Sequence, residues 1–354
     1  SESSESSESS ESSESSKISI KVFRVVRLVS HNDEIVRPDP GFALWDRGKE
    51  VVMIDSDDLE TLHKLSPLAD VVIEDIAPGF EKEVMFRAAA TANPNQVRCT
   101  ISAYGNAGPL FDEPADHDLV MARMGILASQ PSFRGGPIHV MHPVASIGAG
   151  LLAALGVTAA LLHRERTGAA QRVETSLMAG ALLYSPKAIG DNMQPRSMMM
   201  SPAGGGPFYS VFECSDGEWI QLGCIHSGFV DLAASVLGIA HLMTDPEFGD
   251  GRYPQSETAR AKLFNIVANA MRTKPASKWM RIFEDADVPY APALTTEQAM
   301  DDPQIIHNDM VMELDDPLFG MTSLAGLPIN LSQTPGKVRS PRASSAAQAT
   351  DWLS

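Results

Sequence analysis

The chain has 354 residues, 44% hydrophobic and 21% charged, which is enough for two domains with buried cores. It carries 28 Lys and Arg against 45 Asp and Glu, a formal net charge of −17. So acidic a body repels the phosphates of a nucleic-acid backbone, and we expect no nucleic-acid partner.

The first sixteen residues repeat serine and glutamate and contain no apolar side chain, so we interpret residues 1–16 as a disordered tag or placeholder. From residue 17 onward, short apolar runs alternate with helical patterns. This alternation predicts a large α/β domain with a parallel sheet over residues 17–192. The expected strands are 17–29, 50–55, 70–74 and 96–102, and the expected helices between them are 57–65 and 81–91.

Residues 116–164 have a mostly helical pattern. The longest helix is expected to start after Ser146 and to end at Gly168, with the Ser146 hydroxyl as its N-cap. Its apolar run, Ile147–Leu162, is nearly long enough to span a membrane. Because the run is short and rich in glycine and alanine, we favour a buried core helix and expect no membrane partner.

The second half begins with a segment rich in Met, Pro and Gly, residues 193–207, which we interpret as a linker. The Asp216-Gly217 pair between two apolar runs then predicts a β-hairpin. Together with three helices, the hairpin forms a small α+β domain over residues 208–298, and residues 299–354 are expected to return to the large domain. The expected helices are 228–237, 257–272 and 276–285.

Motifs for familiar chemistry are absent: the sequence contains no GxGxxG, no GxxxxGK[ST], no HExxH and no GxSxG. His139 and His142 have a spacing that suits two metal ligands, but no Cys, Asp or Glu nearby completes a set, so we expect no metal site. Three cysteines without a CxxC motif favour reduced thiols and a cytoplasmic location.

Two short motifs remain open from the residues alone. Gly204, Gly205 and Gly206 allow a backbone to approach a ligand closely, although from the residues alone a simple linker turn is the favoured interpretation. His117 stands between Asp116 and Asp118, and flanking carboxylates orient an imidazole for general acid–base catalysis. A solvated helix start is the alternative interpretation of that triplet.

The stretch from Gly148, GAGLLAALGVTAALLHRERTGAAQRVETSLMAGAL, closely resembles the signature of the family III CoA-transferases (CaiB/BaiF). This family includes formyl-CoA transferase, carnitine-CoA transferase and α-methylacyl-CoA racemase. Further segments match in order: ALWDRGK from Ala43, ADVVIE from Ala69, SAYG from Ser102, DGEWI from Asp216, VPYAP from Val288 and LSQTPG from Leu331.

The resemblance implies a doubly wound CoA-binding domain, a smaller second domain and two chains threaded into an interlocked homodimer. It also implies that coenzyme A or acyl-CoA is a substrate rather than a permanently bound cofactor, with a carboxylic acid as the second substrate. In the transferases an aspartate attacks the thioester and forms an anhydride, which CoA thiolate reopens. The racemase instead uses a histidine and an aspartate on opposite sides of the carbon next to the carbonyl.

The chain departs from the family at the catalytic position, since the family aspartate falls on Ser146. His117 matches the racemase histidine and Asp118 the acid beside it. In the second domain, His226 takes the position of a racemase glutamate, and Tyr209 matches an aromatic residue near the active site.

For CoA binding, the resemblance points to the turn containing Asp75 and Ile76, to Lys82 and to the loop Gly204–Gly206. The Asp75–Ile76 turn lacks the basic residue that the family has there, whereas Lys82 is retained. Family members also carry a strand and a helix ahead of the first strand seen here, so we expect that first unit to be missing.

Three functions stay open at this point. The first is CoA transfer between an acyl-CoA and a carboxylic acid, with Ser146 in place of the nucleophilic aspartate. The second is racemase-like or isomerase-like chemistry with His117 as the base. The third is a catalytically silent acyl-CoA binding protein.

Overall fold

The computed structural model describes residues 23–28, 38–55, 59–75, 93–130, 132, 135–184, 205–249, 251, 254 and 256–348. These residues fall into two compact units: one combines the chain up to Leu62 with the chain from Gln304, and the other is His63–Pro303. The expected helix 81–91 and most of the linker 193–207 lie outside the described residues.

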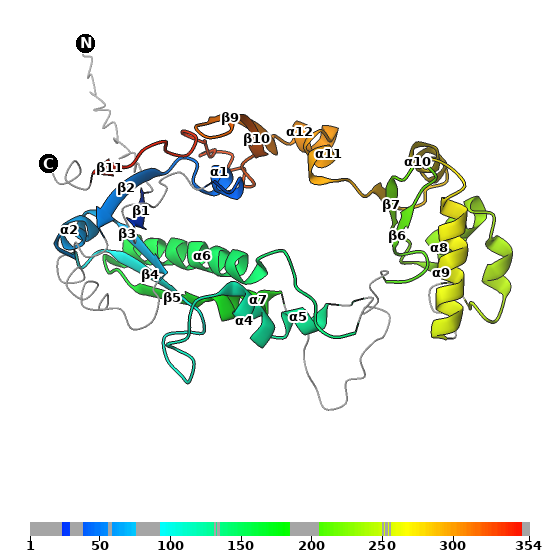
Figure 1. Cartoon of the computed structure of the whole chain (residues 1–354), viewed down its shortest axis with the longest axis horizontal. Helices are drawn as coiled ribbons and strands as arrows, with labels where there is room; N and C mark the ends of the chain where they lie inside the picture. The colour runs from blue at the N-terminus through cyan, green and yellow to red at the C-terminus, as the bar shows by residue number, and fades with distance from the viewer. Residues whose placement is uncertain are drawn as a thin grey trace, which may run out of the picture. The chain divides into compact units, whose positions relative to one another are not determined.

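The first unit contains a parallel sheet in the order β1-β2-β11, which brings the last strand of the chain beside one of the first (Figure 1). An antiparallel hairpin, β9 and β10, belongs to the same unit. The elements are β1 (Phe23–Leu28), α1 (Gly41–Trp45), β2 (Glu50–Asp55), α12 (Pro303–His307), β9 (Val311–Asp316), β10 (Gly320–Ala325) and β11 (Ala347–Gln348).

A buried ion pair fastens the C-terminal segment to this hairpin. Arg342 Nε lies 2.7 Å from Asp316 Oδ2, and both side chains are only 2% exposed. Asp316 Oδ1 also accepts hydrogen bonds from the backbone N–H groups of Leu318 and Phe319. Burial would raise the pKa of Asp316, but the hydrogen bonds from Arg342 and from the two backbone groups outweigh it, and the pKa is lowered.

The N-terminal part of the second unit contains a parallel sheet in the order β3-β4-β5. The alternating pattern predicts these parallel strands but places β1 and β2 in the same sheet, whereas β1 and β2 pair in a separate sheet with β11. The long helix α6 follows β4, precedes β5 and runs along the sheet (Figure 1). Val97 and Cys99 of β4 pack against Ala153, Val157 and Ala160 of α6. The elements are η1 (Ser66–Leu68), β3 (Val71–Asp75), β4 (Val97–Ser102), α6 (Val144–Thr167) and β5 (Arg172–Ser176), and α2 (Leu59–Leu65) contains the division between the two units.

Three shorter helices pack on the first turns of α6: α4 (His117–Arg123), α5 (Ile126–Ser129) and α7 (Leu177–Leu183). Small residues make this packing close. A Cβ atom on Gly180 of α7 would lie 2.3 Å from the carbonyl oxygen of Ala145 and 2.4 Å from the backbone nitrogen of Ala149. Only glycine fits there, and the backbone of α7 therefore touches the backbone of α6.

The start of α6 corrects the prediction for Ser146. The helix begins at Val144, and the N–H of Ile147 donates to the carbonyl of Pro143 at 3.0 Å, so Ser146 lies inside the first turn and does not cap it. Pro143 occupies the N-cap position without a side-chain hydrogen bond. The predicted end is confirmed, because Gly168 follows the last turn with φ 77° and donates to Arg164 O.

The expectation that α6 is a buried core helix holds for one side of the helix only. One face packs on the sheet and on α7, whereas Ile147, Leu151, Leu155 and Leu162 are 46–68% exposed. At 3.6 residues per turn, these four side chains fall within an arc of about 80°. Among the described residues, α6 is the one helix long and apolar enough to cross a membrane.

The C-terminal part of the second unit is a small α+β structure. The predicted hairpin is confirmed, since β6 pairs antiparallel with β7 and Gly217 takes a positive φ of 82° in the turn. The three predicted helices are also confirmed to within one residue at each end. The elements are β6 (Val211–Glu213), β7 (Trp219–Leu222), α8 (Ser227–Val236), η3 (Ala240–Thr244), α9 (Glu257–Met271), α10 (Ala276–Asp285), β8 (Tyr290–Pro292) and α11 (Thr296–Met300).

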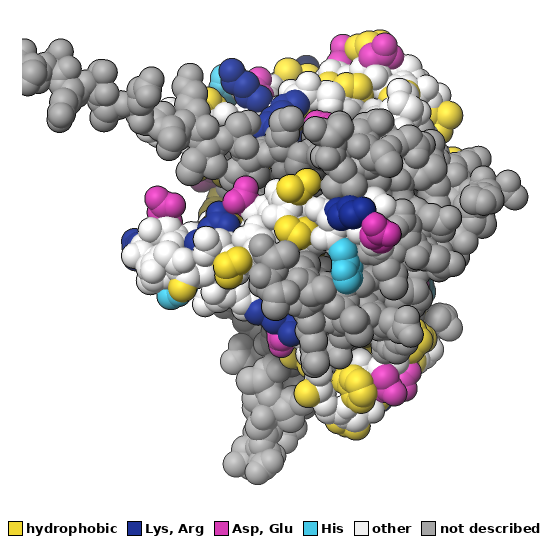
Figure 2. Space-filling model, turned by 90° about the vertical axis from the view of Figure 1, so that its left-hand side faces the viewer, with side chains coloured by type: hydrophobic (Ala, Val, Ile, Leu, Met, Phe, Trp, Pro, Cys, Tyr) yellow, Lys and Arg dark blue, Asp and Glu magenta, His cyan; other side chains and the backbone are white. Residues whose placement is uncertain are grey.

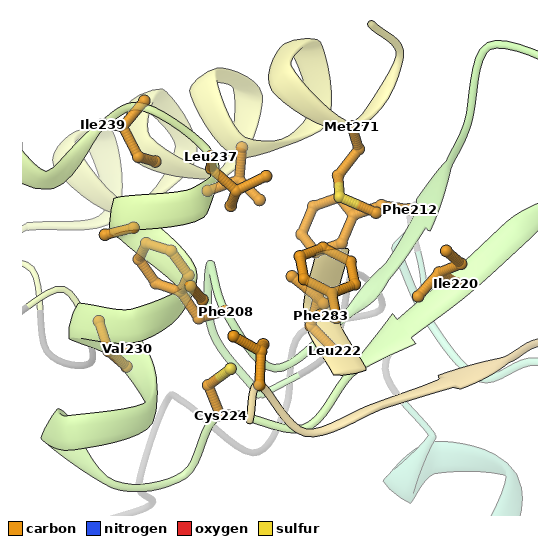
Figure 3. Packing of buried hydrophobic residues seen from close by; sticks show 14 of the residues in the cluster. Phe208, Phe212, Ile220, Leu222, Cys224, Val230, Leu237, Ile239, Met271 and Phe283 are labelled. Atoms are coloured by element: carbon orange, nitrogen blue, oxygen red, sulfur yellow. The ribbon is translucent and has the colours of Figure 1, made fainter. Parts of the chain in front are cut away.

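Large side chains fill the core of this small structure. Figure 3 shows Phe208, Phe212 and Phe283 pointing inward together with Leu222 and Met271. Trp279 stacks on Phe283 with the ring centroids 5.3 Å apart, and its indole N–H donates to the carbonyl of Met271 at 2.7 Å. The core therefore combines aromatic packing with a satisfied buried donor.

Charged side chains on the face drawn in Figure 2 are mixed in sign: Lys and Arg lie next to Asp and Glu instead of gathering into a basic patch. Opposite charges also lie side by side in the ion pairs Arg272–Glu213 and Lys262–Glu247.

Candidate functional site

The candidate site lies at the carboxyl edge of the sheet β3-β4-β5. Ala103 directly follows β4, and its carbonyl accepts a hydrogen bond from the N–H of Met178 at the start of α7, at 3.0 Å. The contact between Gly180 and Ala145 then places the first turn of α6 at the same edge. In open α/β sheets, ligands bind outside the carboxyl ends of the strands.

Ser146 follows Ala145 in that first turn. Ala145 is fully buried against the cluster formed with Val120 and Met121 of α4, whereas Ser146 is exposed. Its hydroxyl is therefore accessible from solvent, in a turn where the helix dipole favours negative charge. A serine hydroxyl can attack a thioester, but the product is an ester and not an anhydride.

His117 and Asp118 form the first turn of α4. His117 Nε2 lies 3.4 Å from Asp118 Oδ1, so the expected contact between these two residues is present. Asp116, by contrast, is the N-cap of α4 and accepts a hydrogen bond from the N–H of Leu119 at 3.0 Å. The triplet therefore divides into a helix cap and a histidine–carboxylate pair.

A residue that sequence reasoning did not assign to the site joins this pair. His139 Nδ1 lies 3.7 Å from the same Asp118 oxygen. The sequence suggests His139 only as a metal ligand together with His142, and its separation from Asp118 along the chain gives no local signal of their contact. Within the described ranges, no three His, Cys, Asp or Glu side chains are placed to hold a metal ion.

Four expected residues belong to the C-terminal part of the second unit, and three of them, Gly205, Gly206 and Tyr209, lie in one turn. Gly205 donates to the carbonyl of Tyr209 at 2.9 Å, and Tyr209 donates back to Gly206 at 3.1 Å. The Tyr209 ring covers the α-carbon of Gly205, where a Cβ atom would lie 2.9 Å from Cδ1. After β7 the chain passes beside this loop, where the N–H of Cys224 donates to the carbonyl of Phe208 at 3.1 Å, and His226 follows as the exposed N-cap of α8.

The remaining expected residues concern CoA binding. Asp75 is the last residue of β3 and so belongs to the same carboxyl edge as Ser102 and Ser176. Ile76, Lys82 and Gly204 lie outside the described residues.

The cysteines are free and buried, and they do not offer a nucleophile. Burial raises the pKa of Cys224 to about 11. Burial, reinforced by nearby carboxylates, does the same for Cys214. Thiols with such values stay protonated and unreactive at neutral pH.

Comparison with known proteins places these features in context. The model of the family described as CoA-transferase family III matches residues 23–344. The chain is 27% identical over 292 residues to the α-methylacyl-CoA racemase of Mus musculus, covering 79% of this chain and 72% of that protein. It is 26% identical over 312 residues to the acetyl-CoA:oxalate CoA-transferase of Acetobacter aceti, covering 82% and 75%.

Solved structures show the same fold. A CAIB/BAIF family protein from Brucella suis superposes with a TM-score of 0.70 at 21% identity, covering 86% of this chain and 80% of that one. The protein Rv3272 from Mycobacterium tuberculosis superposes with a TM-score of 0.67 at 23% identity, covering 85% and 82%.

Proposed function

The chain belongs to CoA-transferase family III, and from this premise we propose that it binds acyl-CoA thioesters and moves CoA between an acyl-CoA and a carboxylic acid. The observation that carries the proposal is the family match over residues 23–344, which includes α4, α6 and α7 around the candidate site. CoA and its thioesters are then substrates, with no permanently bound cofactor.

Ser146 sets a limit on this reaction. In the family route a carboxylate attacks the thioester carbonyl, CoA thiolate leaves, and the enzyme-bound anhydride is reopened by CoA. An ester on Ser146 is much less reactive than an anhydride, so return of the acyl group to CoA is slow. If another carboxylate takes the role, Asp118 is better placed than Asp116, because Asp116 already caps α4.

The histidine–carboxylate pair favours a second candidate function, racemase-like or isomerase-like chemistry on the carbon next to the thioester carbonyl. His117, with Asp118 at 3.4 Å, is arranged as an oriented base that could remove the proton from this carbon. One of the relatives described above is an α-methylacyl-CoA racemase. Ser146 is a poor acid or base, so His117 would serve as the only base.

The proposed architecture is a doubly wound CoA-binding domain in an interlocked homodimer. Its support within this chain is the exposed apolar stripe of α6, formed by Ile147, Leu151, Leu155 and Leu162. A stripe of this kind on a long helix marks a face that another surface covers. For CoA, we propose contacts from the turn after Asp75, from Lys82 and from the glycine loop, with Tyr209 and His226 near the acyl group.

The direct test uses a 2-methylacyl-CoA thioester in deuterium oxide, with and without a free carboxylic acid. CoA transfer produces a new acyl-CoA that depends on the acid, whereas proton removal followed by return of a deuteron from solvent replaces one hydrogen of the thioester by deuterium, which its mass reveals. His117→Ala should abolish the second reaction, and His142→Ala is the control on an exposed histidine nearby.

Binding measured by calorimetry completes the test. Acyl-CoA binding without either reaction identifies a silent acyl-CoA binding protein. Absence of both binding and turnover would contradict the proposal.

A further inference from the structure

The carboxylate of Asp118 lies between two imidazole rings from different segments of the chain. Its Oδ1 is 3.4 Å from His117 Nε2 on α4 and 3.7 Å from His139 Nδ1 on the segment that leads into α6. This oxygen is shielded from solvent and accepts no hydrogen bond from the described residues. Such an acceptor costs free energy until a donor reaches it, and a small rotation of either ring completes the bond.

The backbone on both sides of His139 is anchored. The N–H of Ile138 donates to the carbonyl of Leu127 on α5 at 3.2 Å, and Val140 packs against the buried cluster shared by α4, α6 and α7. The His139 side chain itself is 67% exposed, so packing does not require it. The fold therefore holds an imidazole beside Asp118 without using it in the core.

We propose that His139 is a positioning residue for the His117–Asp118 pair. Its Nδ1–H group holds Asp118 Oδ1 in place, the carboxylate then faces His117, and the orientation of the His117 ring follows from this contact. The same contact ties the first turn of α4 to the segment that precedes Ser146. The consequence for catalysis rests on the proposed function, but the orientation of the ring does not.

Nuclear magnetic resonance of protein labelled at histidine Cε1 tests the orientation without any substrate. The chain has 9 histidines, and the His117 signal is identified by its loss in His117→Ala. His139→Ala should move the His117 signal by more than its line width. His139→Asn, which keeps a donor near the position of Nδ1, should leave the signal close to its original place.

His142→Ala is the matched control, because His142 is an exposed histidine on the same segment. A His117 signal that stays in place in His139→Ala, or that moves equally in His142→Ala, would overturn the proposal.

Proton exchange at the carbon next to the thioester carbonyl then measures the consequence. His139→Ala should lower kcat about tenfold with little change in KM, because a misplaced base loses rate rather than substrate binding. His139→Asn should recover most of the rate. If the resonance shifts as expected but the unchanged protein exchanges no proton, the positioning role stands and the racemase-like function fails.

Discussion

The two well-packed regions of the second unit are built from opposite kinds of residue. Around the candidate site, Ala145, Ala149, Ala181 and Gly180 let the backbones of α6 and α7 touch. In the C-terminal part, Trp279, Phe212 and Phe283 fill the space between helices and strands. Small residues fix the position of a backbone, and therefore of a site, whereas large residues supply most of the buried apolar area.

The aromatic core should give the largest effect on stability. Trp279→Ala removes a side chain that is 1% exposed and leaves both a cavity and an unpaired carbonyl at Met271, so we expect a loss of about 3 to 5 kcal/mol. The control is Trp219→Ala, since Trp219 is 45% exposed in the same part of the chain. Hydrogen exchange followed by mass spectrometry measures the loss of stability in both variants, and equal losses in Trp279→Ala and Trp219→Ala would contradict the role of the core.

The first unit differs from both of these regions, because a buried ion pair between Asp316 and Arg342 stabilises it. Asp316→Asn leaves a buried guanidinium without its counter-charge, and we expect the first unit to lose about 3 kcal/mol. Glu213→Gln is the control, because the Arg272–Glu213 pair is exposed and should contribute about 1 kcal/mol or less. Exchange protection of peptides from β9 and β10 measures the loss.

The same pair predicts a response to acid. The pKa of Asp316 is lowered from its usual value of 3.8, so its contribution to stability is complete above that pH. The contribution is lost as the pH falls through the lower value of the folded state. When the pH is lowered below 4, the hydrogen-exchange protection of β9 and β10 should therefore decrease in the unchanged protein. In Asp316→Asn, which already lacks this charge, it should not decrease further. A parallel fall in both would contradict this assignment.

The glycine contact should give a smaller loss, located at the site. Gly180→Ala places a methyl group against the backbone of α6, and we expect about 2 kcal/mol of destabilisation with increased exchange in the first turns of α4 and α6. Gly150→Ala is the matched control, because a Cβ atom at Gly150 meets nothing within 4 Å. This substitution also replaces a flexible glycine inside a helix by a better helix former. The control should stabilise the chain by about 0.5 kcal/mol; a gain in both variants would refute the close contact.

The smallest effect concerns thiol reactivity. Because the pKa values of Cys214 and Cys224 are raised to about 11, iodoacetamide at pH 8 should alkylate these residues slowly in the folded protein. Urea should make alkylation fast. Rapid alkylation of Cys224 without urea would show that the aromatic core is open.

Local patterns predicted much of the fold. The strand Glu50–Asp55 and the helix Ala276–Asp285 have the expected bounds, because each has clear apolar periodicity and defined ends. The start of α6 was placed too late because serine is a common N-cap, whereas the chain enters this helix through Pro143.

The site was predictable only in part. The contact between the neighbours His117 and Asp118 follows from their adjacency in the sequence, and the resemblance points to Ser146, but the catalytic roles of these residues stay predictions. The contact between His139 and Asp118 joins a helix to a distant loop, and no periodicity or spacing in the sequence indicates it. The exposed face of α6 was missed as well, since composition does not distinguish a helix buried all round from one buried on a single face.

The central claim is that this chain handles acyl-CoA as its family does and that Ser146 limits the transfer. The most direct measurement compares the unchanged protein with Ser146→Asp after incubation with acyl-CoA, using hydroxylamine trapping, peptide mapping by mass spectrometry and an assay of CoA exchange with a free acid. We expect a hydroxylamine adduct at position 146 and fast CoA exchange in Ser146→Asp, and no adduct with at most slow CoA exchange in the unchanged protein. Rapid CoA exchange by the unchanged protein with an adduct on Ser146, or no acyl-CoA binding by either protein, would contradict the claim.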